Sequence, residues 1–205
     1  MSKTTPATVA LTRAGIAFAL HPYDYDPDAP RTGLQAAEAL GWAPEQVFKT
    51  LMTLVDGAPA CVVVPSDCEV SMKKLAAVFG GKSAQMMKPA DAERLTGFKV
   101  GGVSPFGQRK PVRTVIDETA VLFDQVLINA GQRGLLLAIA PEDAVKATLS
   151  RLTESMSILR GAYRDMEAAA NPQANANKPK GEAPAYLKNQ IANYQAGLNR
   201  LMGGG

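Results

Sequence analysis

The clearest structural signal in the chain lies in residues 50–64, which read TLMTLVDGAPACVVV. Two runs rich in apolar and β-branched residues flank Asp56-Gly57, a dipeptide typical of a tight hairpin turn. The pattern therefore predicts two antiparallel strands, at residues 50–55 and 60–64.

Helix and strand signals alternate on both sides of this hairpin. Pro44 predicts a short helix through Phe48, which leaves Lys49 at a helix-to-strand junction. The other predicted helices cover residues 6–14, 33–40, 72–79, 89–95 and 141–156, and the other predicted strands cover residues 16–20, 83–86, 112–116, 125–129 and 135–139. Strands among flanking helices predict a mixed α/β domain.

Two segments are incompatible with regular structure. Residues 21–30 contain three prolines and three aspartates, and residues 100–107, VGGVSPFG, contain three glycines and one proline. We expect both to be loops.

The composition changes near residue 157. Residues 1–156 read as one globular domain of ordinary size, and residues 157–205 read as an appendage. Within the appendage, residues 171–185 have the composition of a flexible linker, and residues 186–202 have the spacing of an amphipathic helix. The appendage is open to three interpretations: docking on the domain, binding a partner, or a fusion.

Charge and cysteine content narrow the class of protein. The stretch 73–113 holds nine basic residues and only two acidic ones, which fits an ordinary solvated surface or the footprint of a nucleic acid. Cys61 and Cys68 are too few for a disulfide framework or a zinc site, and Cys61 reads as a buried structural thiol. No membrane span or signal peptide is recognisable, so we expect a cytoplasmic protein.

Most catalytic devices are excluded because His21 is the only histidine. A serine or cysteine triad would have to use it, and no metal cluster can be assembled around it. The glycine-rich loop has neither the Walker nor the dinucleotide-binding pattern. What remains is Lys49 and a loop whose amides can face a developing negative charge, with a solvent-exposed lysine and a plain tight turn as the alternatives.

At these residues the chain resembles the YbaK/EbsC family of aminoacyl-tRNA deacylases, which are related to the editing domain of bacterial prolyl-tRNA synthetases. Four ordered motifs carry the resemblance. They are HPYDYDP at 21–27, QVFKTL at 46–51, TGFKVGGVSPFGQ at 96–108 and GQRGL at 131–135. The resemblance implies a compact mixed β-sheet with a barrel-like core surrounded by helices.

The resemblance also implies the chemistry: hydrolysis of misacylated tRNA, Cys-tRNA(Pro) first, without a metal or an organic cofactor. Aminoacyl-tRNA would bind by its acceptor end, and prolyl-tRNA synthetase is a candidate partner. The implied catalytic residues are Lys49, Gly101 and Gly102, and the implied substrate-binding residues are Tyr23, Thr50, His21, Ser104, Asn129 and Arg133.

Two positions depart from the family's cysteine-specific members, which have a serine at the position of Asn129 and an aspartate at that of Leu136. The exchange of a carboxylate for an apolar residue changes what the pocket can bind. Alanine or another small amino acid is therefore the alternative substrate, with direct attack by water. A non-catalytic module that binds tRNA or a synthetase is the alternative function.

Overall fold

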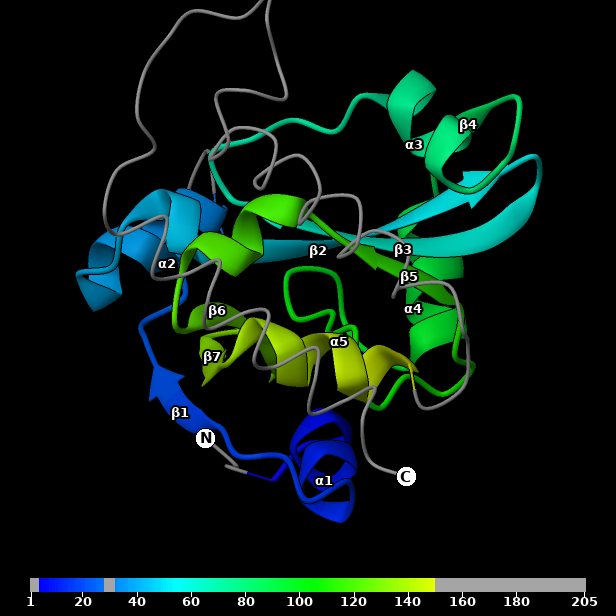
Figure 1. Ribbon diagram of the computed structural model, residues 1–205. Helices are drawn as coiled ribbons and strands as arrows, with labels where there is room; N and C mark the ends of the chain where they lie inside the picture. The colour runs from blue at the N-terminus through cyan, green and yellow to red at the C-terminus, as the bar shows by residue number, and fades with distance from the viewer. Residues whose placement is uncertain (1–3, 28–31, 150–205) are drawn as a thin grey trace, which may run out of the picture.

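The computed structural model describes residues 4–27 and 32–149, so that the predicted linker and helix of the appendage lie outside the described residues. Figure 1 shows its helices around one curved sheet. The elements are α1 (Pro6–Arg13), β1 (Ala19–Pro22), α2 (Thr32–Leu40), η1 (Pro44–Gln46), β2 (Val47–Val55), β3 (Ala58–Pro65), α3 (Met72–Val78), β4 (Ala84–Met86), α4 (Pro89–Thr96), β5 (Arg113–Ile116), η2 (Glu118–Leu122), β6 (Val126–Gln132), β7 (Leu135–Ile139) and α5 (Pro141–Leu149).

The mixed α/β prediction is confirmed by a seven-stranded sheet of order β1-β7-β6-β2-β3-β5, with β4 added to β2. β2 pairs antiparallel with β3 but parallel with β6, and β3 pairs parallel with β5. Figure 1 shows the long β2–β3 pair crossing the middle of the molecule. This pair is the part of the sheet from which the candidate site is built.

Side chains pack on both faces of the sheet because strand residues alternate between faces. One face carries the main apolar cluster, which includes Phe48, Met52 and residues of α1, α4 and α5. The other face carries two smaller clusters. One joins Val55 of β2 to α3, and the other joins Val47 to α2. The sheet therefore separates α2 and α3 from α1, α4 and α5.

The predicted hairpin is confirmed, with longer strands than the sequence indicated. Asp56 and Gly57 have φ values of 47° and 83°, the left-handed conformation that a two-residue turn of this kind requires. Val55 pairs with Ala58 across the turn. The Asp56 carboxylate accepts hydrogen bonds from the backbone amides of Lys82 and Ser83, both at 2.8 Å. It thereby ties the hairpin to the start of β4.

Replacing Asp56 by asparagine is expected to lower the melting temperature near neutral pH. The amides of Lys82 and Ser83 lower the pKa of Asp56 from its ordinary value, so the carboxylate stabilises the fold above the unfolded-state pKa of about 4 and loses that effect as the pH falls through the folded-state pKa. Melting curves between about pH 6 and pH 3 test this. The gap between wild type and Asp56→Asn should narrow in acid, and a constant gap would contradict the assignment.

Two sequence predictions were wrong at element boundaries. The strand predicted at 16–20 is β1 at Ala19–Pro22, because Ile16 is buried and its amide donates to the Leu11 carbonyl at the end of α1. The helix predicted from Pro44 through Phe48 is a single 3-10 turn ending at Gln46. β2 begins at Val47, which pairs with Leu127 of β6 and accepts a hydrogen bond from the amide of Ser66, just after β3.

Lys49 therefore lies inside β2 and not at a helix-to-strand junction. His21 lies in β1 and not in a loop. The last predicted helix, 141–156, is confirmed as far as Leu149, and its remainder lies outside the described residues. No helix in the described ranges is both long and apolar enough to cross a membrane.

Candidate functional site

The candidate site is a cavity of about 280 Å³ beside the middle of β2. Five of the nine residues expected from the sequence line it. They are Tyr23, Lys49, Thr50, Gly101 and Asn129. The rest of the lining is mainly apolar and includes Leu136.

The cavity exists because the two strands that pair with one edge of β2 leave a gap between them. On the edge away from β3, β2 pairs with β6 only at Val47 and Phe48, and with β4 only from Thr53 to Val55. Between these two pairings no strand within residues 4–27 and 32–149 pairs with this edge of β2. Residues 49–51, the end of the QVFKTL motif, thus lie at an opening in an otherwise continuous sheet.

Thr50 directs its backbone polar groups into this opening. The Val47 carbonyl accepts from Ser66 on the β3 side, and the Met52 carbonyl accepts from Met87 on the opposite side. Because hydrogen-bonding direction alternates along a strand, Thr50 faces the same way as Met52. Its hydroxyl oxygen is also buried and has no hydrogen-bond partner among the described residues. A buried hydroxyl without a partner, on a residue that lines a cavity, is a candidate contact for a polar ligand once a small movement exposes it.

Lys49 projects from the opposite face of β2 to Thr50 because the two are consecutive strand residues. Its Nζ donates a hydrogen bond of 3.2 Å to the Ser66 carbonyl, and its side chain is half-buried. Among the described residues no carboxylate forms an ion pair with it. The ammonium is thus held in place at the cavity with hydrogen-bonding capacity left for an anionic or carbonyl oxygen.

The glycine-rich loop forms the wall opposite β2. Gly101 has φ 86°, and the Gly102 amide donates to the Lys99 carbonyl at 2.8 Å, which closes a tight turn. Asn129 donates from Nδ2 to the Gly101 carbonyl at 3.3 Å. Its Oδ1 accepts from the backbone amide of Gly131. The Gly102 amide is therefore occupied, and only Gly101 of the two glycines lines the cavity.

Arg133 fastens this loop from outside the cavity. Its Nε donates to the Val100 carbonyl at 2.8 Å, and its guanidinium lies 5.6 Å from the centre of the Tyr25 ring. The side chain is exposed and does not line the cavity. Its place in the structure is that of a positioning residue for the loop.

Replacing Arg133 by alanine is expected to reduce turnover about tenfold, since the loop loses its anchor to Val100. Arg133→Lys is the matched control for charge, because it keeps the positive charge and loses the planar group that reaches both partners. Measurement of kcat and KM for both variants and the wild type checks whether this anchor matters. Full turnover in both would show that the loop needs no anchor.

Tyr23 lies just after β1, is half-buried and faces the cavity. Burial raises the pKa of its hydroxyl, with a further contribution from Tyr25. The hydroxyl is therefore protonated at neutral pH and can donate a hydrogen bond to a ligand.

Two expected site residues lie elsewhere. His21 packs edge-on against Trp42 with ring centres 5.7 Å apart. Ser104 is fully buried, and its hydroxyl accepts from the Phe106 amide at 3.3 Å. Neither lines the cavity. The cavity is also lined by Ser66, Met86 and Met87, which no sequence motif contains and which were therefore not predicted.

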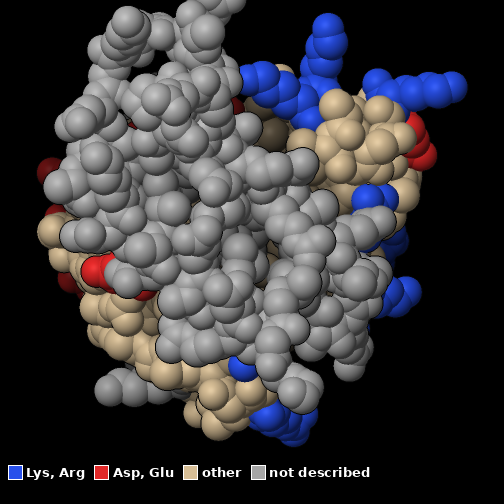
Figure 2. Space-filling view, viewed as in Figure 1, with Lys and Arg blue, Asp and Glu red and all other residues tan. Residues whose placement is uncertain are grey.

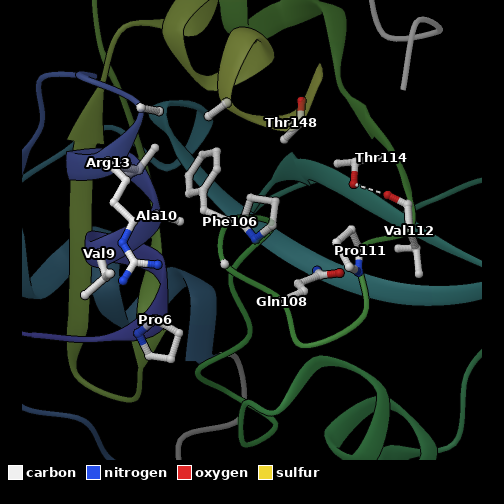
Figure 3. A pocket seen from close by; sticks show the side chains of 15 residues that line it. Pro6, Val9, Ala10, Arg13, Phe106, Gln108, Pro111, Val112, Thr114 and Thr148 are labelled. Atoms are coloured by element: carbon white, nitrogen blue, oxygen red, sulfur yellow. Dashed lines mark hydrogen bonds between the residues drawn. The ribbon is translucent and has the colours of Figure 1, made fainter. Parts of the chain in front are cut away.

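A second cavity, of about 520 Å³, lies between α1, the 105–112 loop and the end of α5 (Figure 3). Its polar groups already have partners: Gln108 donates to the Ser104 carbonyl, Thr114 to the Val112 carbonyl, and Thr148 to the Val145 carbonyl. Of the described residues in its wall, Arg13 alone is ionisable. It offers no group suited to chemistry, so the smaller cavity is the better candidate.

Neither of the two cysteines lines the cavity. Cys61 is fully buried, and burial raises the pKa of its thiol to about 12. It is an inert core residue, as predicted. Within residues 4–27 and 32–149, no three histidine, cysteine or carboxylate side chains gather as a metal site would require.

Comparison with known proteins adds the family. The profile of the aminoacyl-tRNA editing domain matches residues 28–147, which contain β2, the glycine-rich loop and most of the cavity. The chain belongs to the aminoacyl-tRNA editing domain family.

Two relatives of this editing domain carry names that bear on its role. EbsC of Enterococcus faecalis, a proposed Cys-tRNA(Pro)/Cys-tRNA(Cys) deacylase, is 35% identical over 119 residues, which are 58% of this chain and 73% of EbsC. The proline–tRNA ligase of Streptococcus suis is 27% identical over 108 residues, which are 53% of this chain but only 17% of the ligase. The editing domain thus occurs both as a small protein and within a much larger one.

Solved structures confirm the fold of the editing domain. A crystal structure of a proposed trans-editing enzyme for prolyl-tRNA synthetase has a TM-score of 0.62 at 24% identity and covers 72% of this chain and 94% of that one. The crystal structure of the hypothetical protein APE2540 has a TM-score of 0.60 at 26% identity and covers 70% and 94%.

Proposed function

We propose that this protein is a trans-editing hydrolase that cleaves the ester bond of misacylated aminoacyl-tRNA. The observation that carries the proposal is the position of Lys49, Thr50 and Gly101 around one cavity at the interrupted edge of β2. Membership of the editing-domain family supports it. The protein acts where tRNA is charged, in the cytoplasm, with prolyl-tRNA synthetase as a candidate partner.

Each lining residue has a role suited to its geometry. Lys49 holds the terminal adenosine or its phosphate with the ammonium that Ser66 positions. The protonated Tyr23 hydroxyl and the unsatisfied Thr50 hydroxyl fix the aminoacyl group. The Gly101 amide faces the ester carbonyl, because the Gly102 amide already donates to the Lys99 carbonyl. Positioning supplies most of the rate, so the protein needs no nucleophile of its own.

With a cysteinyl ester, the substrate thiol attacks its own carbonyl carbon. A carbon–sulfur bond forms, the carbon–oxygen bond to the ribose breaks, and the thiol proton passes to the ribose oxygen. Water then opens the cyclic thioester to free cysteine. With an alanyl ester, water attacks the carbonyl carbon directly, and alanine and the tRNA 3′ hydroxyl are released.

The lining favours a small, uncharged amino acid. Leu136 is buried in β7 and lines the cavity, while Asn129 uses its side chain to hold the glycine-rich loop. Among the described residues no carboxylate lines the cavity, so a cationic side chain would lose its hydration there without gaining a partner. Cysteine is our first choice and alanine the second.

A panel of Cys-tRNA(Pro), Ala-tRNA(Pro) and Cys-tRNA(Cys) tests the proposal. We expect turnover of Cys-tRNA(Pro), and the relative kcat/KM values name the amino acid and show whether the tRNA matters. Absence of turnover on every member would contradict the enzyme assignment and favour a module that binds tRNA without cleaving it.

A further inference from the structure

A basic patch lies beside the candidate site. Residues 70–88, which form α3, β4 and their flanking turns, contain four lysines and no acidic residue. We call these lysines the α3–β4 patch. Its members are Lys73, Lys74, Lys82 and Lys88, and all four are exposed. Figure 2 shows Lys and Arg side chains projecting together at the upper right, over the position of α3 and β4 in Figure 1.

The lysines of the patch form no ion pair among the described residues. In the part of the chain that the structure describes, the ion pairs join Arg94 to Asp91 and Lys99 to Glu93, and none involves the patch. The nearby Asp56 carboxylate, which accepts from the backbone amides of Lys82 and Ser83, stays charged. Together with the exposed Asp67 and Glu69 just before α3, it offsets part of the positive charge of the patch without forming an ion pair with it. A group of exposed lysines without ion-pair partners creates a local positive potential that attracts polyanions.

The patch shares a face of the sheet with the candidate site. Leu75 of α3 and Phe79, which follows the helix, pack with Leu51 and Val55 of β2. These two strand residues lie on the same face of the sheet as Lys49 because all three occupy odd-numbered positions of β2. Leu51 itself lines the cavity. Lys88 lies between Met87 and Pro89, which both line the cavity. Positive charge therefore runs from α3 to the edge of the cavity.

Exposed apolar side chains accompany this charge. Met86 is 49% exposed and Val100 is 40% exposed, and both line the cavity. Exposed apolar contacts next to lysines are suited to a partner that combines bases with phosphates, since a base has an apolar face and its backbone is anionic.

We propose that the α3–β4 patch binds the phosphate backbone of the tRNA acceptor stem, while Met86 and Val100 contact the unpaired bases that lead to the aminoacyl group. The proposal rests on the proposed function, because it assumes that the 3′ end of a tRNA enters the cavity. The patch supplies affinity without sequence preference, since phosphate contacts position a nucleic acid and carry no sequence information. The cavity, and not the patch, determines which amino acid is removed.

The test uses the full chain with Lys73→Ala/Lys74→Ala, because alanine is favourable in a helix and these side chains are exposed. The matched control is Arg13→Ala/Lys146→Ala, which removes two exposed positive charges from α1 and α5, across the sheet from α3. Binding of uncharged tRNA is measured against salt concentration. Hydrolysis is measured on aminoacyl-tRNA and on the minimal ester, 2′(3′)-O-aminoacyl-adenosine.

We expect the patch variant to weaken tRNA binding about tenfold at low salt and to reduce the slope of log affinity against log salt by about 1 to 2, while the control does neither. Hydrolysis of the minimal ester should be unchanged, with the loss on aminoacyl-tRNA appearing in KM.

Equal tRNA affinity and equal salt slope for wild type and patch variant would overturn the proposal. A wild type that binds tRNA through the patch but hydrolyses neither ester would sink the proposed function alone. An equal loss on both esters would also count against the patch, because a site for the acceptor stem has no contact with aminoacyl-adenosine.

Discussion

Replacing Lys49 by alanine is expected to lower kcat/KM for aminoacyl-tRNA by about 100-fold or more, the cost typical of removing one positioned charge from a reacting centre. The side chain is fixed by its bond to the Ser66 carbonyl and lines the cavity. In the Lys49→Ala variant the backbone of the cavity is kept, but the Lys49 ammonium group is lost. Initial rates of amino acid release measure the effect.

Lys49→Met is the companion variant, because methionine preserves most of the half-buried aliphatic stem and removes only the charge. It should be as inactive as Lys49→Ala while melting close to the wild type. Lys146→Ala on α5, an exposed lysine across the sheet, should keep full activity. An active Lys49→Met would show that packing rather than charge matters at this position.

Replacing Gly102 by alanine is expected to reduce turnover by about 100-fold through displacement of the loop, since shifts of about 1 Å at a reacting centre cost this much. A Cβ at this position would lie 2.7 Å from the Arg133 amide nitrogen and 2.9 Å from the Gln132 carbonyl carbon. Both are backbone atoms and cannot rotate away. The loop would therefore move and lose the bonds to Asn129 and Arg133.

Gly15→Ala is the matched control for this variant. Gly15 has φ 67° with open space around the position of a Cβ, and it lies between α1 and β1. Alanine there should lower stability by about 1 kcal/mol through backbone strain and leave kcat unchanged. Thermal melts beside rate measurements separate the two effects. Gly102→Ala with normal turnover would mean that the loop takes no part in catalysis.

The elements predicted best are those with local signals at both ends. Asp56-Gly57 has the two left-handed residues that the turn requires. Ser71 accepts from the Lys74 amide at the start of α3, and Gly97 ends α4 in the left-handed conformation. In each case the deciding interaction lies within four residues, so the sequence carries it directly.

The wrong helix at residues 44–48 arises where a distant strand decides the structure. Val47 and Phe48 follow a proline that favours a helical turn, yet they pair with β6, about eighty residues further along the chain. A sequence pattern cannot weigh that pairing against the local preference. The η2 turn at Glu118–Leu122 was also missed, although Asp117 caps it by accepting from the Thr119 amide.

In the candidate site, too, the motifs identify residues but not the arrangement of the strands around them. Resemblance named Lys49, Thr50 and Gly101, and these residues do line one cavity. It could not show that Ser104 lies in the core, because burial depends on the path of the whole loop. Nor could it show that the cavity arises from the gap between β6 and β4 on one edge of β2, which is a property of the sheet and not of any motif.

The most direct measurement of the central claim is the release of cysteine from Cys-tRNA(Pro) by the purified protein with substrate in excess, in parallel with Lys49→Ala. The account predicts many turnovers per wild-type molecule and a rate in the variant close to that of spontaneous hydrolysis. Equal rates for the two proteins, whether both fast or both at the spontaneous level, would contradict it.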